Sequence, residues 1–171
     1  MKDLIVLNSP SAKEKVVEDV RSDHSAARIV LLGVPDVPGV AAKVFSALAE
    51  QQVGAAMIVQ NNMRGGMTDI GFLVRKERLD AAIVVCRKVA AEVGAQGVSF
   101  NTEVARVSVC GRNLGDNPEV PAKMFSALAK AGVNIEMIVS NALDITCVVA
   151  EPSASAAVEA LQKAFPEDLE V

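Results

Sequence analysis

The chain has 171 residues, is 51% hydrophobic and carries a formal charge of −4, so it holds enough apolar material for two domains of about 70 residues each. It has no Trp, no Tyr and no cluster of basic residues, and therefore lacks the charge and the stacking surface that nucleic-acid binding requires. Its apolar runs fall short of the roughly 18–20 residues of a membrane span, and no signal peptide opens it, so we expect a cytoplasmic protein that contacts no membrane.

One motif occurs twice in the sequence. Residues 38–49 read PGVAAKVFSALA, residues 118–129 read PEVPAKMFSALA, and MIV at 57–59 recurs at 137–139. Two copies are too few for a solenoid, which needs three or more stacked repeats. The sequence therefore predicts two tandem modules related by a pseudo-twofold axis, and we expect the functional site between them.

The first copy alternates β-branched apolar runs with apolar residues at helical spacing. Turn residues separate these segments, and Gly94 marks the end of the second helix. The predicted elements, in chain order, are a strand at 28–34, a helix at 40–51, strands at 55–61 and 68–75, a helix at 79–93 and a short strand at 97–100.

The second copy repeats this order with a tighter hairpin. Its predicted elements lie at 106–111, 118–131, 134–141, 143–150 and 152–164, which leaves 168–171 for a closing strand. The fold class is α+β, a ferredoxin-like βαββαβ unit present twice, with the helices on one side of each antiparallel sheet. We place the modules at 28–103 and 104–171, while residues 1–27 form either an extra strand or a linker.

Chemistry is expected where the first helix begins. Gly39 follows Pro38 there, and the bare N–H groups and the positive end of the helix dipole suit an anion such as the carboxylate of an amino acid. Asp36 in the same loop suits an ammonium group, and the amides of Gln60 and Asn61 suit a polar ligand. The alternative is structural: Asp36 belongs to a helix-capping region and the amides cap a hairpin.

No pattern of catalytic or metal-ligating residues is visible. His24 is the only histidine and precedes the first module, and the three cysteines lie in apolar stretches typical of buried side chains. No Ser/His/Asp, Cys/His or metal-ligand spacing occurs. We therefore expect no catalytic residue, no metal and no cofactor.

Five segments carry a family resemblance: GVPDVPGVAAKVFSALAE, MIVQN, MTDIGF, PAKMFSALAKAGVNIEMIVSN and DITCVV. They resemble the paired ACT domains at the regulatory end of aspartate kinase, from about Asp23 to Phe165. The resemblance implies that feedback amino acids, threonine and in many members lysine, bind at interfaces between modules. The kinase signature of the family does not occur here, so the chain resembles the separate regulatory (β) subunit that some bacteria make from an internal start, or an excised regulatory region.

The resemblance also implies an effector site. It draws on the loop and helix start after the first strand, on the amide pair of the second strand, and on an Asn-Ile pair of the opposite module. The matching residues are Asp36, Val37, Pro38, Gly39, Val40, Ala41, Gln60, Asn61, Asn134 and Ile135.

The pseudo-symmetric second site departs from the family pattern. Glu119 replaces the glycine that matches Gly39, and its carboxylate repels an incoming anion. Gly54 and Ala55 stand where the Asn-Ile pair is expected, and residues 139–142 lack the acidic residue of the family. These departures favour threonine over lysine as the effector.

The resemblance thus implies a regulatory subunit that forms a homodimer, binds the catalytic subunit of aspartate kinase and controls aspartate phosphorylation in lysine, threonine and methionine biosynthesis. Two alternatives stay open at this point. One is a dimerisation module in which ACT sheets join edge to edge and no ligand binds. The other is an amino-acid sensor attached to a different metabolic enzyme.

Overall fold

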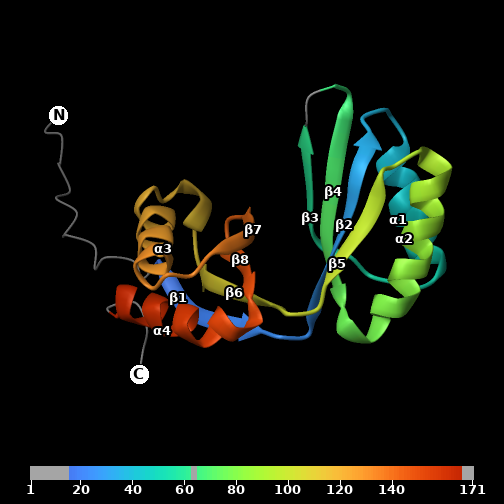
Figure 1. Ribbon diagram of the computed structural model, residues 1–171. Helices are drawn as coiled ribbons and strands as arrows, with labels where there is room; N and C mark the ends of the chain where they lie inside the picture. The colour runs from blue at the N-terminus through green and yellow to red at the C-terminus, as the bar shows by residue number, and fades with distance from the viewer. Residues whose placement is uncertain (1–15, 63–64, 167–171) are drawn as a thin grey trace, which may run out of the picture.

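The computed structural model describes residues 16–62 and 65–166, which form two modules, each a four-stranded antiparallel sheet with two helices on one face (Figure 1). The first module has sheet order β3-β4-β2-β5. Its elements are β2 (Ala26–Pro35), α1 (Val40–Glu50), β3 (Ala56–Asn62), β4 (Met67–Arg75), the 3-10 turn η1 (Lys76–Arg78), α2 (Leu79–Val93) and β5 (Gly97–Asn101).

The second module has sheet order β1-β6-β8-β7. Its elements are β1 (Val17–Asp23), β6 (Val104–Gly111), the 3-10 turn η2 (Leu114–Asp116), α3 (Glu119–Lys130), β7 (Ile135–Ser140), β8 (Asp144–Ala150), the 3-10 turn η3 (Glu151–Ser153) and α4 (Ala154–Ala164). The predicted α+β class and the repeated ferredoxin-like plan are confirmed. Among the described residues, no helix is both long and apolar enough to cross a membrane.

Strand β1 completes the second module from the N-terminal side of the chain. It runs antiparallel to β6, in the position that β5 takes beside β2 in the first module. Val17 and Val20 are buried in the core of the second module, which explains why this segment belongs there. Of the two predictions for residues 1–27, the extra strand holds for Val17–Asp23, and the boundary at residue 27 is corrected because the first module is inserted into the second. The closing strand predicted at 168–171 lies outside the described residues.

The backbone just before β1 also explains why residue 111 is a glycine. A Cβ atom on Gly111 would lie 1.9 Å from the carbonyl oxygen of Val16, and Arg112 donates its backbone N–H to that oxygen at 2.9 Å. No other residue type fits at Gly111 unless the backbone of this segment moves.

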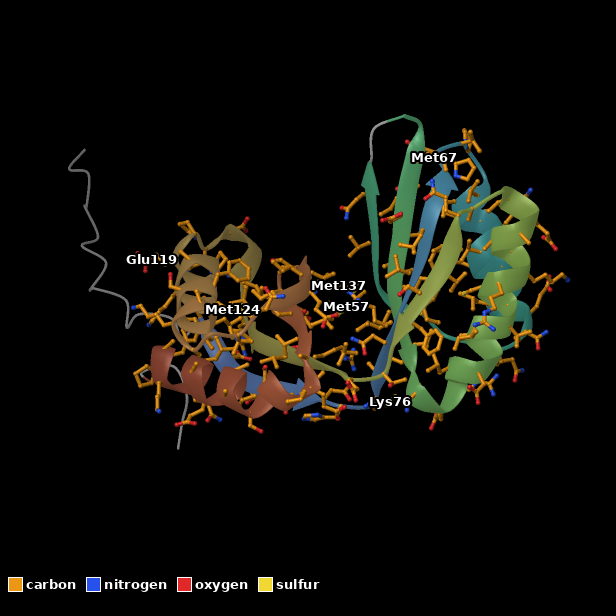
Figure 2. The ribbon with its side chains drawn as sticks, viewed as in Figure 1. Met57, Met67, Lys76, Glu119, Met124 and Met137 are labelled. Carbon is orange, nitrogen blue, oxygen red and sulfur yellow. The ribbon has the colours of Figure 1, made fainter. Side chains whose placement is uncertain are left out.

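Two matched cores lie under the helices, and a third cluster joins the modules. Its members stand at equivalent positions of the two copies. They are Ala26 and Val104 at the starts of β2 and β6, Leu73 and Val148 on β4 and β8, and the partly buried Met57 and Met137. Figure 2 shows Met57 and Met137 adjacent between the two modules. The contact between modules is therefore pseudo-symmetric and apolar at its centre.

Ion pairs surround this cluster. Lys76 and Glu151 open the equivalent turns η1 and η3, and their side chains meet each other at 3.2 Å, because the equivalent positions carry opposite charges. His24 Nδ1 lies 3.3 Å from the other oxygen of Glu151. Arg106 pairs with Asp23 at the end of β1. These ion pairs lie beside the two connections between the modules, from β1 to β2 and from β5 to β6.

The register of β1 predicts how a charged substitution acts. Val17→Asp places an unpaired carboxylate in the core of the second module, so we expect a loss of roughly 3–5 kcal/mol in its unfolding free energy. Ser22→Asp adds the same charge at an exposed position of the same strand and should cost no more than about 0.5 kcal/mol. Hydrogen exchange should show lost protection in β6 and β8 but not in β2 and β4. Equal effects of both variants would contradict the assignment of β1.

The Asp23 contacts predict a pH dependence. Hydrogen bonds from Ser25 and Arg106 hold the pKa of the Asp23 carboxyl well below its ordinary value. A lowered folded-state pKa contributes stability above the unfolded pKa of about 4, and this contribution is lost as pH falls through the folded-state value. From about pH 6 to about pH 2, Asp23→Asn should therefore lose less stability than the wild type in chemical denaturation. Glu92→Gln, which changes an exposed carboxylate on α2, should match the wild type.

Candidate effector site

The N-terminus of α1 carries no side-chain cap. Gly39 is its N-cap residue, with a left-handed φ of 96°, and no acidic residue lies in the first turn. Residues 36–39 and Ala41 are exposed, whereas Val40 is buried and anchors the helix to the core. Because the first N–H groups of a helix have no partner within the helix, this end presents donors and a partial positive charge to solvent.

The backbone of the preceding loop is held in place. Asp36 donates its N–H to the carbonyl of Gly66 at 2.8 Å, and Val37 donates to the carbonyl of Pro35 at 2.9 Å. The loop is thus tied to the turn between β3 and β4. Among the described residues, the Asp36 carboxylate forms no hydrogen bond or ion pair, so it is free to accept from a ligand.

The N-terminus of α3 is different. Asn117 Oδ1 accepts from the backbone N–H of Glu119 at 2.9 Å and from that of Val120 at 3.2 Å. The next residue, Pro121, has no N–H to offer. Glu119 adds a carboxylate to the first turn and is exposed at the end of the second module that faces away from the first (Figure 2). The backbone N–H groups of Glu119 and Val120 thus already have a hydrogen-bond acceptor, and the Glu119 carboxylate repels an anion at this helix start.

Asn117 and Pro121 were missed in the sequence, although a signal for both was present. They occupy the places of Val37 and Ala41 in the other copy, and asparagine is among the preferred N-cap residues. Of the differences at the helix start itself, the sequence interpretation relied on the replacement at Glu119 alone. The structure adds two further differences: Asn117 caps α3, and Pro121 has no backbone N–H.

The amide pair lies on β3. Asn61 is exposed and stands opposite Asp69 in the β3–β4 ladder, while its carbonyl accepts from the hydroxyl of Thr68. Asn61 and Ile135 line one cleft of about 400 Å³ between the sheet of the first module and β7. Gln60, Asn134 and the loop at 36–41 are not among the lining residues of this cleft. The structure thus brings together one predicted residue from each module in this cleft, and the α1 loop does not line it.

Two of the three cysteines are buried in the cores. Burial raises the pKa of the Cys86 and Cys147 thiols to about 11, so neither is a thiolate near neutral pH. In the part of the chain that the structure describes, no three His, Cys, Asp or Glu side chains are grouped so that they can hold a metal ion.

Comparisons with known proteins agree with the fold of two repeated modules. The ACT domain family model matches residues 29–89 and 107–165, one match for each module. The regulatory subunit of aspartate kinase from Thermus thermophilus, in its ligand-free form, superposes with a TM-score of 0.84 at 40% identity, over 88% of this chain and 99% of that one. The chain belongs to the ACT-domain regulatory subunits of aspartate kinase.

Longer relatives place this regulatory subunit within a larger architecture. A Thermus thermophilus aspartokinase is 39% identical over 157 residues, which cover 91% of this chain but 38% of that protein. The chain thus spans well under half the length of the curated aspartokinases that it matches. Aspartate kinase from Synechocystis superposes with a TM-score of 0.85 at 35% identity, over 92% of this chain and 28% of that one.

The capping difference in this regulatory subunit predicts unequal stabilities. Asn117→Ala removes the cap of α3 and should lower the unfolding free energy by about 0.5–2 kcal/mol. Val37→Asn places the same side chain at the equivalent position before α1, where it should cap the helix and raise stability by a similar or smaller amount. Chemical denaturation of both variants checks this. A neutral Asn117→Ala would contradict the role of Asn117.

Proposed function

We propose that the chain senses threonine at the N-terminus of α1 and thereby regulates an aspartate kinase catalytic subunit. The observation that carries the proposal is the difference between the two helix starts: α1 is uncapped and exposed, whereas α3 is capped by Asn117. Duplication preserved the fold in both modules, and the donors that an amino acid needs are left in one of them.

Each part of threonine has a matching group at this site. Its carboxylate accepts from the N–H groups at Gly39 and Ala41, where the helix dipole contributes about 0.3–2 kcal/mol. Its ammonium donates to the Asp36 carboxylate. The side-chain amides of Gln60 and Asn61 orient its hydroxyl, because an amide both donates and accepts.

Asn134 and Ile135 of the opposite module complete the site, in a homodimer. The edge strands β3 and β7 support this part of the proposal, because Ile58 and Ile138 at equivalent positions on them remain 51% and 47% exposed. Exposed strand edges with apolar side chains favour pairing with another copy. Lysine is the less favoured effector, since the second helix start offers an anion no donor.

The regulated partner is an aspartate kinase catalytic subunit in the cytoplasm, acting in lysine, threonine and methionine biosynthesis. A relative supports this partner: the solved aspartokinase with alpha and beta subunits contains a chain that superposes with a TM-score of 0.82 at 31% identity. Feedback inhibition requires that threonine bind one arrangement of the modules better than the other. A coupling free energy of about 1–3 kcal/mol would change kinase activity roughly 5–150-fold.

Calorimetric titration of the chain with threonine tests the site. We expect binding to weaken at least about tenfold in Asp36→Ala, which removes the ammonium partner and corresponds to about 1.4 kcal/mol. Val37→Asn should weaken it as well, because the new cap competes for the same N–H groups. Asp116→Ala, the equivalent change before α3, is the matched control and should leave binding unchanged.

Two results would overturn the proposal. The first is the absence of threonine binding to a folded wild-type chain. The second is an equal loss in Asp36→Ala and Asp116→Ala, which would place the effect outside the α1 site. A dimer that forms at the same concentration with and without every amino acid of the pathway would favour a purely structural module instead.

A further inference from the structure

We propose that the cleft between the sheet of the first module and β7 is a second amino-acid site, separate from the N-terminus of α1. Its charged groups come from both modules: Arg28 and Asp69 from the first, and Glu136 from the second. Its volume of about 400 Å³ falls within the usual range of roughly 300–1,000 Å³ for small-molecule sites. The inference goes beyond the proposed function, because it uses different residues for the carboxylate and the ammonium.

A β-bulge aims Glu136 at the cleft. On β7, Ile135 pairs with Val149 and Met137 pairs with Val148, so Glu136 is the extra residue between two consecutive partners. Bulges redirect a side chain and often lie next to functional sites. Here Glu136 Oε2 comes within 3.1 Å of Arg28 Nη1, with 20% of the Glu136 side chain and 26% of the Arg28 side chain exposed.

This ion pair leaves capacity on both partners. Arg28 and Glu136 meet as an ion pair, and the buried Glu136 Oε2 accepts no hydrogen bond among the described residues. The charge of Arg28 compensates this carboxylate, and its buried oxygen can still accept a hydrogen bond from a ligand that brings a donor. A guanidinium has five donors, and Arg28 makes no other hydrogen bond within the described part of the chain.

A second carboxylate and a glycine shape the same cleft. Asp69 uses Oδ1 to accept from the backbone N–H of Gly33 at 2.7 Å, which fixes its orientation and leaves Oδ2 without a partner among the described residues. Gly71 lies two residues further along β4, where a Cβ atom would be in ordinary van der Waals contact with Met137 Cε at 3.9 Å. A larger side chain at Gly71 would fill this space.

The pseudo-symmetric position is lined by different groups. Ala56 is the counterpart of Glu136, as the repeated MIV motif aligns them, so no carboxylate projects there. Arg106, the counterpart of Arg28 on β6, is instead paired with Asp23. The pseudo-symmetric side has a cleft of its own, of about 550 Å³, in which Arg106 and Asp23 pair with each other, so the combination of Arg28, Asp69 and Glu136 occurs on one side of the module contact.

These groups define the ligand class. A guanidinium beside two carboxylates fits an α-amino acid, whose carboxylate binds Arg28 and whose ammonium donates to Glu136 and Asp69. The remaining wall includes Val30, Val59 and Ile138, so an apolar side chain suits it best. A ligand in this position bridges β2 and β7 and thus holds the two modules in one arrangement.

Calorimetric titration of the 171-residue chain with methionine and valine tests the inference. We expect at least one of them to bind, and Glu136→Gln and Arg28→Gln each to weaken this binding at least about tenfold. Asp69→Asn keeps the acceptor for Gly33 but removes the charge, and should weaken it too. Arg106→Gln breaks an ion pair of the same kind outside the cleft, and it should bind like the wild type.

Asp36→Ala separates this site from the α1 site, since it should leave methionine and valine binding intact whether or not threonine binds. The inference is overturned if neither amino acid binds the folded wild-type chain. It is also overturned if Arg106→Gln weakens binding as much as Glu136→Gln does, because the ion pairs would then act only by holding the modules together. Thermal unfolding of each variant confirms that the compared proteins are folded.

Discussion

The pairing of β1 with β6 determines how the two modules meet. The chain leaves the second module after Asp23, builds the whole first module, and returns at Val104, so two connections cross side by side (Figure 1). This crossing places the equivalent starts of β2 and β6 against each other. Leu73 and Val148 then pack in the same cluster, and Lys76 pairs with Glu151 across it. The pseudo-symmetric contact is thus a consequence of an inserted module, which is joined to the second module by both connections.

On this symmetric scaffold, the polar groups differ between the copies. The helix start of α1 is exposed, while that of α3 is satisfied by Asn117 and lacks a donor at Pro121. The cleft beside β7 contains Glu136, and its counterpart has an alanine. A duplicated fold needs its apolar residues in both copies because each core depends on them. Polar surface residues carry no such requirement, so one copy is free to keep a binding function that the other loses.

Much of the fold was predictable from the sequence, because strand and helix periodicities are local. The repeat at Val40–Ala49 and Val120–Ala129 gave the modules, and the turns around Gly66 and Gly94 gave their element order. The role of β1 was not predictable in this way. Its residues show a short apolar pattern, but which sheet they join depends on pairing with β6, far along the chain.

The candidate site residues likewise include some that the sequence could identify and some that it could not. Asp36 and Gly39 were identifiable from turn chemistry and the family resemblance, and Asn117 was visible to a residue-by-residue comparison of the copies. The pair Arg28 and Glu136 was not, because the two residues lie far apart in sequence and a β-bulge sets the direction of Glu136. Long-range pairs of this kind need coordinates.

We infer that the helix starts of α1 and α3 differ in their ability to bind the carboxylate of an amino acid, because α1 has no side-chain cap whereas Asn117 caps α3. A threonine titration of the ¹⁵N-labelled chain, followed by NMR, tests it most directly. We expect the amide resonances of Gly39, Val40 and Ala41 to shift as threonine is added, while those of Glu119 and Val120 stay in place. Equal shifts at both helix starts, or shifts at α3 alone, would contradict it.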